Sequence, residues 1–282
     1  MMLAVGAFAG SADYTQNGAN WHDICEYGRE QSPIDLSVKG ATVSDKMELM
    51  GFNYYDFKQN SKFSAEDPTL TTYFDSEPMR TNAELAITFP DGSQSYFTPL
   101  QFHFHAPSEH TVDGKYYDLE VHFVHTIKGS GSVNGVAQAE IPGAVLGIFF
   151  DVKEGGKAPN AFLDSLFNAV DTRGTASAGN VDIRKFLAAV DMTEYWSYDG
   201  SFTTPPCTEG IKWSVIKQVQ SISPEQLARF TSRMAGNNAY AGGKGNNRVI
   251  MPLNERVLSY SGSASLVASM ALAVATVTAL AF

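Results

Sequence analysis

The sequence predicts an α+β fold, predominantly β, built on a central, mostly antiparallel sheet with short helices at its periphery. Several stretches alternate apolar and polar residues with period two, as half-buried strands do, whereas helical patterns are few and short. The length of 282 residues and a hydrophobic content of 44% suit one large domain with a sizeable core.

The elements are expected in a definite order. Alternation predicts strands at residues 84–89, 96–105, 117–125 and 145–150. Helical patterns follow at residues 161–169, 181–189 and 224–234, where Ser223 suits the N-cap and Pro224 the first helical position. The pair Asp113-Gly114 is a hairpin signal, so we expect the strands before and after it to be antiparallel neighbours.

The stretch QFHFHAPSEH, residues 101–110, contains three of the six histidines. His103 and His105 alternate with Phe102 and Phe104, so both imidazoles project from one face of a strand and both phenyl rings from the other. A single histidine in a strand is usually a hydrogen-bonded structural residue. Two neutral imidazoles side by side on a rigid strand can chelate a metal.

A third ligand is expected on the neighbouring strand, where His122 lies on the same face as Glu120 and Val124. Three imidazoles leave one tetrahedral position open, which is typical of a catalytic zinc site. Gln101 and Glu120 each precede a histidine by two residues, so they are candidates to accept the second N–H of His103 and His122.

The local spacing leaves an alternative open. The pattern His103-x-His105-x₃-Glu109 also matches the metal-binding core of cupins, in which Glu109 would be a ligand and the metal iron or manganese. The glycines of that motif would fall at Phe97 and Tyr116, so the match is partial.

Six motifs along the chain carry a broader resemblance. They are, in order, GREQSPIDL, LQFHFHAPSEH, LEVHFVH, AVLGIFF, SFTTPPCTEGIKW and NNRVIMPLNER. Together they resemble the α-class carbonic anhydrases over most of the chain. The resemblance implies a catalytic domain at residues 13–259, a large twisted sheet with zinc at the base of a cone-shaped cleft, and one zinc ion per chain. The activity implied is the reversible hydration of carbon dioxide to bicarbonate and a proton, with sulfonamide-type compounds and anions as inhibitors.

The resemblance also assigns roles to individual residues. His103, His105 and His122 are implied to be the zinc ligands. Thr203 is implied to accept a hydrogen bond from the zinc-bound hydroxide and to pass its own proton to Glu109, which then lies outside the ligand set.

Further residues surround this centre by the same resemblance. Thr204 is implied to contact bicarbonate, the carbonyl of Asn246 to support His105, and Tyr14 to belong to the proton-transfer water network. The apolar wall that holds carbon dioxide is implied to consist of Val124, Val145, Phe202, Ile211 and Trp213.

The cysteines and the two ends of the chain point to export. Cys25 and Cys207 match positions that form a disulfide in extracellular members of the family, and disulfides imply an oxidising compartment. Residues 1–12 are apolar and end in small residues, as a partial secretory signal does. Residues 260–282 end in an uncharged apolar run, which predicts attachment to the outer membrane face by a glycolipid-type anchor or a short helix.

Net charge and histidine positions narrow the function further. A net charge of −10 argues against a nucleic-acid partner, because phosphates are bound by clustered lysine and arginine. A second hypothesis is a non-catalytic binding module of the same fold, but such relatives lose zinc ligands that this chain keeps.

The sequence has no histidine between His22 and His103, the region where fast members of the family carry a proton-relaying histidine.

Overall fold

The computed structural model of the chain describes residues 12–42, 49–53, 62–63, 70–73, 84–89, 92–127, 132–133, 136–137, 142–171, 181 and 183–262. The expected signal segment lies outside the described residues except for Ala12, and so does the apolar tail from residue 263 onward. No helix in the described part of the chain is long and apolar enough to cross a bilayer.

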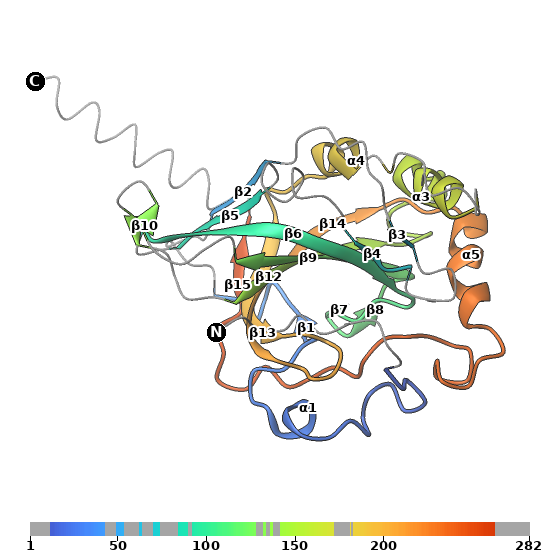
Figure 1. Ribbon diagram of the computed structural model, residues 1–282, viewed down its shortest axis with the longest axis horizontal. Helices are drawn as coiled ribbons and strands as arrows, with labels where there is room; N and C mark the ends of the chain where they lie inside the picture. Colours follow the sequence, from blue (N-terminus) through green and yellow to red (C-terminus); the bar gives the residue numbers. More distant parts are fainter. Residues whose placement is uncertain are drawn as a thin grey trace, which may run out of the picture.

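A curved ten-stranded sheet forms the centre of the molecule (Figure 1). Its strands follow the order β15-β13-β14-β12-β9-β6-β4-β3, and β5 and β2 extend it beside β6. Strands β12 and β14 are parallel, whereas the other neighbours in this sheet are antiparallel. The predicted, mostly antiparallel central sheet is therefore confirmed.

The sheet contains all four strands expected from the sequence, with small differences at their ends. Its strands are β2 (Leu49–Asn53), β3 (Lys62–Phe63), β4 (Thr72–Tyr73), β5 (Glu84–Thr88), β6 (Gln94–His105), β9 (Leu119–Ile127), β12 (Gly143–Phe150), β13 (Tyr195–Ser201), β14 (Glu209–Gln220) and β15 (Ser259–Ser261).

Three helices cover one face of this sheet: α3 (Ala161–Asp171), α4 (Ile183–Ala189) and α5 (Pro224–Met234). All three were expected, and α5 begins with the predicted cap. The Ser223 hydroxyl accepts a hydrogen bond from the Gln226 backbone N–H at 3.2 Å, and the Gln226 side chain accepts one from the Ser223 N–H at 3.2 Å. This reciprocal capping box explains why the helix starts at Pro224.

The largest hydrophobic core lies between the helices and the sheet. Phe102 on β6 and Phe123 on β9 are paired in register and are buried against Phe162 of α3. The rings of Phe162 and Phe186 stack with centroids 4.4 Å apart, which joins α3 to α4. Because side chains alternate along a strand, the residues between these phenylalanines face the other side of the sheet.

The hairpin signal at Asp113-Gly114 forms a smaller structure than expected. It joins β7 (Thr111–Val112) to β8 (Lys115–Tyr116), which form a separate three-stranded sheet with β1 (Asp35–Leu36). Asp113 and Gly114 both have positive φ, at 50° and 78°, as this kind of tight turn requires. Strands β6 and β9 are antiparallel neighbours as predicted, but the connection between them includes this extra hairpin.

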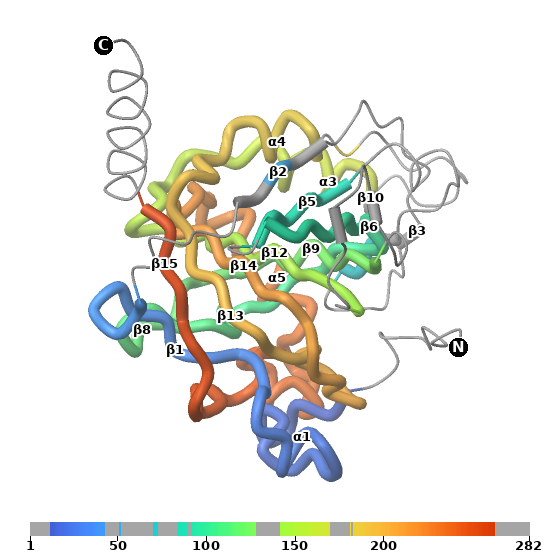
Figure 2. Tube along the Cα trace, turned by 90° about the vertical axis from the view of Figure 1, so that its left-hand side faces the viewer, coloured from blue at the N-terminus to red at the C-terminus, as the bar shows by residue number. Residues whose placement is uncertain are grey.

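Segments from the two ends of the described chain lie side by side (Figure 2). The short helix α1 (Ile24–Tyr27) follows an N-terminal segment that pairs with the chain after α5. The Tyr14 N–H donates to the Ala239 carbonyl at 2.8 Å, and the Ala241 N–H donates to the Tyr14 carbonyl at 3.0 Å. The remaining described strands, β10 (Ser132–Val133) and β11 (Val136–Ala137), form a two-stranded pair.

Candidate metal centre

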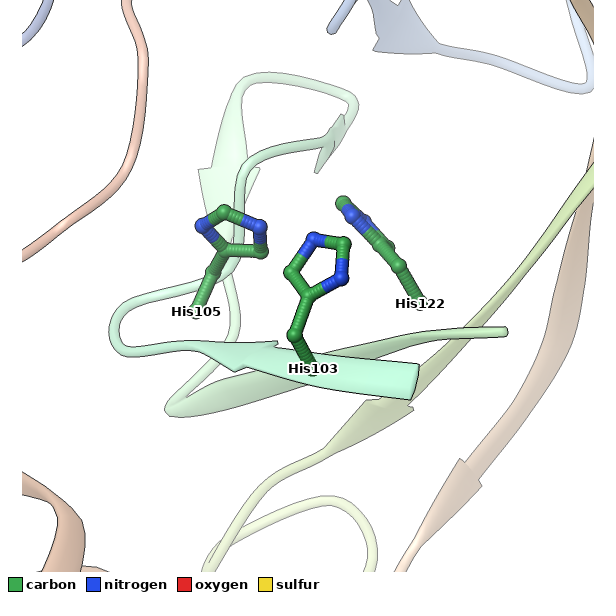
Figure 3. A group of neighbouring side chains, drawn as sticks. All are labelled: His103, His105 and His122. Atoms are coloured by element: carbon green, nitrogen blue, oxygen red, sulfur yellow. The ribbon is translucent and has the colours of Figure 1, made fainter. Parts of the chain in front are cut away.

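Three histidine side chains converge on one face of the sheet (Figure 3). Strand alternation places this face opposite the one on which Phe102 and Phe123 pack against the helices. His103 and His105 project from β6, and His122 projects from β9 directly across from His103. One ring nitrogen from each lies within 4.8 Å of the others. The structure therefore brings together the three residues that the sequence predicted as metal ligands, and it does so by strand register.

The other nitrogen of each ring is committed to a protein oxygen. His103 Nδ1 lies 2.9 Å from Gln101 Oε1, and His105 Nδ1 lies 2.9 Å from the Asn246 carbonyl oxygen. His122 Nε2 lies 2.9 Å from Glu120 Oε1, an ion-pair contact whose angles fall outside hydrogen-bond geometry. These oxygens only accept hydrogen bonds, so the committed nitrogens carry the hydrogens. The lone pairs that remain are on His103 Nε2, His105 Nε2 and His122 Nδ1.

The environment favours the uncharged form of His103 and His105. Burial, followed by the proximity of His105 and His122, holds the pKa of His103 well below its usual value. Burial also lowers the pKa of His105. His105 Nε2 is buried and has no hydrogen-bond partner among the described residues. A buried lone pair without a partner is costly in a protein alone, and it fits a residue that binds a metal ion.

Glu120 connects His122 to a second buried histidine. Its Oε1 atom lies 2.8 Å from His110 Nδ1, and its Oε2 atom accepts the backbone N–H groups of Glu109 and His110, each at 2.9 Å. Burial would raise the pKa of Glu120, but its electrostatic interactions with His110 and then His122 outweigh burial and hold the pKa well below its usual range. Glu120 is therefore an ionised acceptor that fixes the His122 ring.

Sequence reasoning missed the next part of this network. His110 Nε2 lies 2.7 Å from the Tyr198 hydroxyl, and that hydroxyl lies 2.9 Å from Ser32 Oγ. His110 was visible as the third histidine of its motif, but its partners are 88 and 10 residues away. No periodicity relates residues so far apart, so only the fold reveals the connection.

An apolar surface lies beside the histidines on the same face. Val124 on β9, Val145 on β12 and Trp213 on β14 are consecutive partners across three strands. Val124 follows His122 by two residues, so it shares the face of His122. Four residues of the predicted apolar wall belong to one buried hydrophobic cluster, and the fifth, Phe202, packs against it; the four are Val124, Val145, Ile211 and Trp213.

A comparison with known protein families decides the identity of this centre. The family model described as eukaryotic-type carbonic anhydrase matches residues 16–262. The chain belongs to the eukaryotic-type carbonic anhydrase family. Carbonic anhydrases hydrate carbon dioxide reversibly to bicarbonate and a proton, and this is the activity of the chain. The family is zinc-dependent, and the three histidines described above are the residues that fit such an ion.

Individual relatives agree with this assignment. Alpha carbonic anhydrase 3 of Arabidopsis thaliana is 32% identical over 259 residues, which cover 90% of this chain and 81% of the relative. The carbonic anhydrase of Neisseria gonorrhoeae is 29% identical, covering 92% and 94%. Among solved structures, the carbonic anhydrase Cah3 from Chlamydomonas reinhardtii in complex with acetazolamide has a TM-score of 0.66 at 27% identity, covering 86% and 95%. The α-carbonic anhydrase from Thermovibrio ammonificans in complex with sulfanilamide has a TM-score of 0.60 at 30% identity, covering 84% and 89%.

Glu109 lies beside the histidines but in a different arrangement from the one the resemblance implied. Its Oε1 atom accepts the Arg248 backbone N–H at 2.9 Å, and its Oε2 atom faces His105 Nε2 at 3.4 Å and His122 Nδ1 at 3.8 Å. That Oε2 atom has no hydrogen-bond partner in the described part of the chain, so the expected bond from Thr203 is not formed. The family assignment excludes the cupin alternative, in which Glu109 would be a metal ligand.

The loop that follows β13 carries Thr203 and Thr204. Thr203 is buried, whereas Thr204 is half-buried, and the Thr204 carbonyl accepts the Cys207 N–H at 2.8 Å. Cys207 forms the predicted disulfide with Cys25, with a Cα–Cα distance of 5.2 Å. The disulfide therefore ties this carbonic anhydrase loop to the N-terminal segment.

Tyr14 is buried in a small aromatic cluster around the disulfide. Its ring packs edge-on against Trp21 with centroids 5.4 Å apart and lies 6.2 Å from the Tyr240 ring. The same cluster includes both cysteines. The implied role of Tyr14 in proton transfer stays a prediction.

Proposed function

We propose that one zinc ion per chain is held by His103 Nε2, His105 Nε2 and His122 Nδ1 and that it serves the hydration of carbon dioxide. The observation that carries the proposal is that each imidazole has one nitrogen 2.9 Å from an oxygen acceptor and its other nitrogen facing the same cluster. When bound there, zinc supplies a Lewis acid that lowers the pKa of a water molecule to roughly 7.

Three acceptors hold the ligands for this role. Gln101, the Asn246 carbonyl and Glu120 each take one ring hydrogen, so each ring has one tautomer and one orientation. Neutral Gln101 and the Asn246 carbonyl add no charge, and Glu120 adds one negative charge next to His122. We infer that Glu120 strengthens His122 as a donor to the metal.

Thr203 is proposed to orient the nucleophile. Its hydroxyl can accept a hydrogen bond from the nucleophile only if its own hydrogen is donated elsewhere. The bond from Thr203 to Glu109 is not formed in the structure, and we propose that it forms when the nucleophile is bound. The Glu109 carboxylate offers the acceptor, because Oε1 is already used by the Arg248 N–H and Oε2 remains without a partner in the described part of the chain. A lone pair of the nucleophile is then aimed at the carbon of the substrate.

The substrate is proposed to lie against the apolar wall formed by Val124, Val145, Phe202, Ile211 and Trp213. Carbon dioxide is small and apolar, so a surface without competing hydrogen-bond donors suits it. Thr204, half-buried next to Thr203, is proposed to contact bicarbonate. Solved relatives in complex with acetazolamide and with sulfanilamide support the proposal that sulfonamides bind this centre, with anions as a second inhibitor class.

We further propose that the protein is exported and attached to the outer face of a membrane through the apolar tail that follows β15. The boundary expected at residue 260 is too early, because Tyr260 and Ser261 pair with β13 in the central sheet. The Cys25–Cys207 disulfide supports export, because disulfides persist in oxidising compartments. Treating intact membranes with a phospholipase that cleaves glycolipid anchors separates the two modes. Release of the protein indicates a lipid anchor, and retention indicates a helix.

The central experiment compares two histidine variants of the same strand. Purified protein should contain one zinc per chain and hydrate carbon dioxide, whereas His122→Ala should lose both properties. His125→Asn is the matched control, because His125 is buried on the same strand but faces the other side of the sheet. Near-normal zinc content in His122→Ala would show that the third ligand is wrong. A native protein without zinc and without activity would instead indicate the non-catalytic module.

A further inference from the structure

Ser32 occupies a junction between two parts of the active site. It is fully buried, and its Oγ atom lies 2.9 Å from the Tyr198 hydroxyl and 3.1 Å from the Ser201 backbone nitrogen. The Ser32 N–H in turn donates to Ser201 Oγ at 3.0 Å. One small side chain therefore contacts the middle of β13 and its end.

The first connection leads to the proposed metal ligand His122. From Ser32 it passes through the Tyr198 hydroxyl to His110 Nε2 at 2.7 Å, and from His110 Nδ1 to Glu120 Oε1 at 2.8 Å. Glu120 Oε1 lies 2.9 Å from His122 Nε2. Every residue in this chain of contacts is buried, so solvent does not replace a lost link.

The second connection leads to the loop of Thr203, which follows Ser201 by two residues. Ser201 is held from both sides, because its N–H donates to Ser32 Oγ and its carbonyl accepts the Trp213 indole N–H at 2.9 Å. Trp213 belongs to the apolar wall, so this hydrogen bond also connects Ser201 to the surface where carbon dioxide is proposed to lie. The position of Ser201 limits where Thr203 can lie.

Packing at Gly200 supports the view that the Ser32 hydroxyl is tightly placed. A Cβ atom at Gly200 would lie 2.2 Å from Ser32 Oγ, far inside van der Waals contact. Only glycine at this position lets the hydroxyl approach the backbone of β13 so closely. Gly200 therefore leaves the space in which the Ser32 hydroxyl accepts the Ser201 N–H.

We propose that Ser32 is a positioning residue for hydration, whose hydroxyl holds the Thr203 loop at a fixed place relative to the His122 side of the metal centre. The inference rests on the proposed function and extends it to a residue outside the ligands and their acceptors. Removing the hydroxyl leaves the Ser201 N–H and the Tyr198 hydroxyl with one partner fewer in a buried place, which loosens both connections together.

The test measures zinc affinity and turnover separately in Ser32→Ala. Zinc affinity of the metal-free protein is obtained by competition with a chelator, and kcat/KM is measured on the zinc-saturated protein. Outer partners of metal ligands typically change affinity or activity by about 10–100-fold, so we expect at least about a threefold loss in each quantity for this more distant residue. Ser223→Ala is the matched control: it removes another buried hydroxyl, the cap of α5, and should lower stability without changing either quantity.

A second variant distinguishes the connection from Ser32 to His122 from a general loss of folding. Tyr198→Phe keeps the ring and removes only the hydroxyl, so it breaks the connection to His122 and leaves the Ser32–Ser201 contacts in place. It should lower zinc affinity more than kcat/KM, and combining it with Ser32→Ala should add little further loss of zinc affinity, because both break the same path.

Two results would overturn the inference. One is wild-type zinc affinity and kcat/KM in Ser32→Ala, even if that variant is less stable. The other is full additivity of the two variants in zinc affinity. The proposed function itself fails in a different way, namely if the unmodified protein binds no zinc or does not hydrate carbon dioxide.

Discussion

At the scale of single residues, the chemistry of the site depends on which atoms carry hydrogens. A carboxylate only accepts hydrogen bonds, whereas an amide also donates. Glu109 uses one oxygen to accept the Arg248 N–H and keeps the other free of partners among the described residues. A glutamine at position 109 would carry an NH₂ group, which donates hydrogen bonds, in place of one acceptor oxygen. Glutamate and glutamine have almost the same shape, but only glutamate accepts hydrogen bonds at both atoms.

Thr203→Ala tests the orienting role. It removes a hydroxyl but no metal ligand, so zinc content should stay at the native level while kcat/KM falls by about 10²-fold, as misplacement of reacting groups can cost. Stopped-flow hydration with zinc analysis of the same sample checks this. Unchanged kcat/KM would mean that the Thr203 hydroxyl does not contact the nucleophile.

Glu109→Gln provides the companion measurement. It should reduce kcat/KM in the same way as Thr203→Ala and retain zinc, because the proposed ligands are the three histidines alone. Loss of zinc from Glu109→Gln would place Glu109 in the ligand set and contradict the roles assigned here.

At the scale of elements, the periodic and local features were predictable and the long-range contacts were not. Alternation along β6 and β9 identified His103, His105 and His122, because strand geometry alone puts side chains i and i+2 on one face. The cap of α5 was readable because Ser223 directly precedes Pro224, which suits the first helical position, whereas the return bond from Gln226 was seen only in the structure. Ser32 and Tyr198 were missed because they are joined only by the fold, across 166 residues.

Strand β9 also carries a histidine that the reaction does not use. His125 is fully buried, with Nδ1 3.3 Å from the Ala144 carbonyl oxygen. Burial lowers the pKa of His125 from 6.5 to about 4. The folded state therefore disfavours its protonation, whereas the unfolded chain protonates it normally.

The sign of the pH effect follows from this difference. Between pH 6.5 and about pH 4 the unfolded state binds more protons at His125, so stability is lost as pH falls through this window. Going from pH 7 to pH 5 should cost about 2 kcal/mol at this site. Denaturant unfolding of wild type and His125→Asn at both pH values isolates the contribution, since other groups titrate in both proteins. Equal pH dependence in the two proteins would show that His125 is not buried neutral.

At the scale of the whole molecule, the Cys25–Cys207 disulfide joins segments 182 residues apart. It lies within the aromatic cluster of Tyr14 and Trp21, and its second cysteine ends the loop of Thr203 and Thr204. The Arg248 guanidinium donates to the Cys25 carbonyl at 2.6 Å, and Arg248 also contacts Glu109 through its backbone N–H. The disulfide and the hydrogen bonds of Arg248 thus connect the Thr203 loop, the N-terminal segment and the active site to one another.

Reduction of this disulfide should lower the free energy of unfolding by about 5 kcal/mol, because a long closed loop restricts the unfolded chain. Denaturant unfolding with and without a reductant, under conditions in which thiol labelling confirms complete reduction, measures the effect. A Cys25→Ala/Cys207→Ala variant should match the reduced protein and should not respond to reductant. Equal stability of oxidised and reduced protein would contradict the expectation.

The route of the product proton also concerns the whole molecule. The chain has no histidine between His22 and His103, and the His22 side chain is 85% exposed beside Glu26. Histidine suits a proton relay because its ordinary pKa of about 6.5 lies near neutrality. Glu77 lies in that stretch of sequence and is a carboxylate that could relay the proton instead, but it is outside the described residues. We therefore expect the proton to reach solvent without a histidine relay.

A direct route to water limits turnover in a way that can be measured. Recombination with a proton cannot exceed roughly 10¹⁰ M⁻¹s⁻¹, so a donor with a pKa near 7 releases its proton at no more than about 10³ s⁻¹. Added imidazole-type buffer should accept the proton and raise kcat, while kcat/KM, which reports the hydration step, should barely change. His22→Ala is the control and should follow the same buffer dependence as the unmodified protein. Turnover far above this limit at vanishing buffer concentration would show that a residue of the protein carries the proton. If the high turnover is then lost in His22→Ala, that residue is His22.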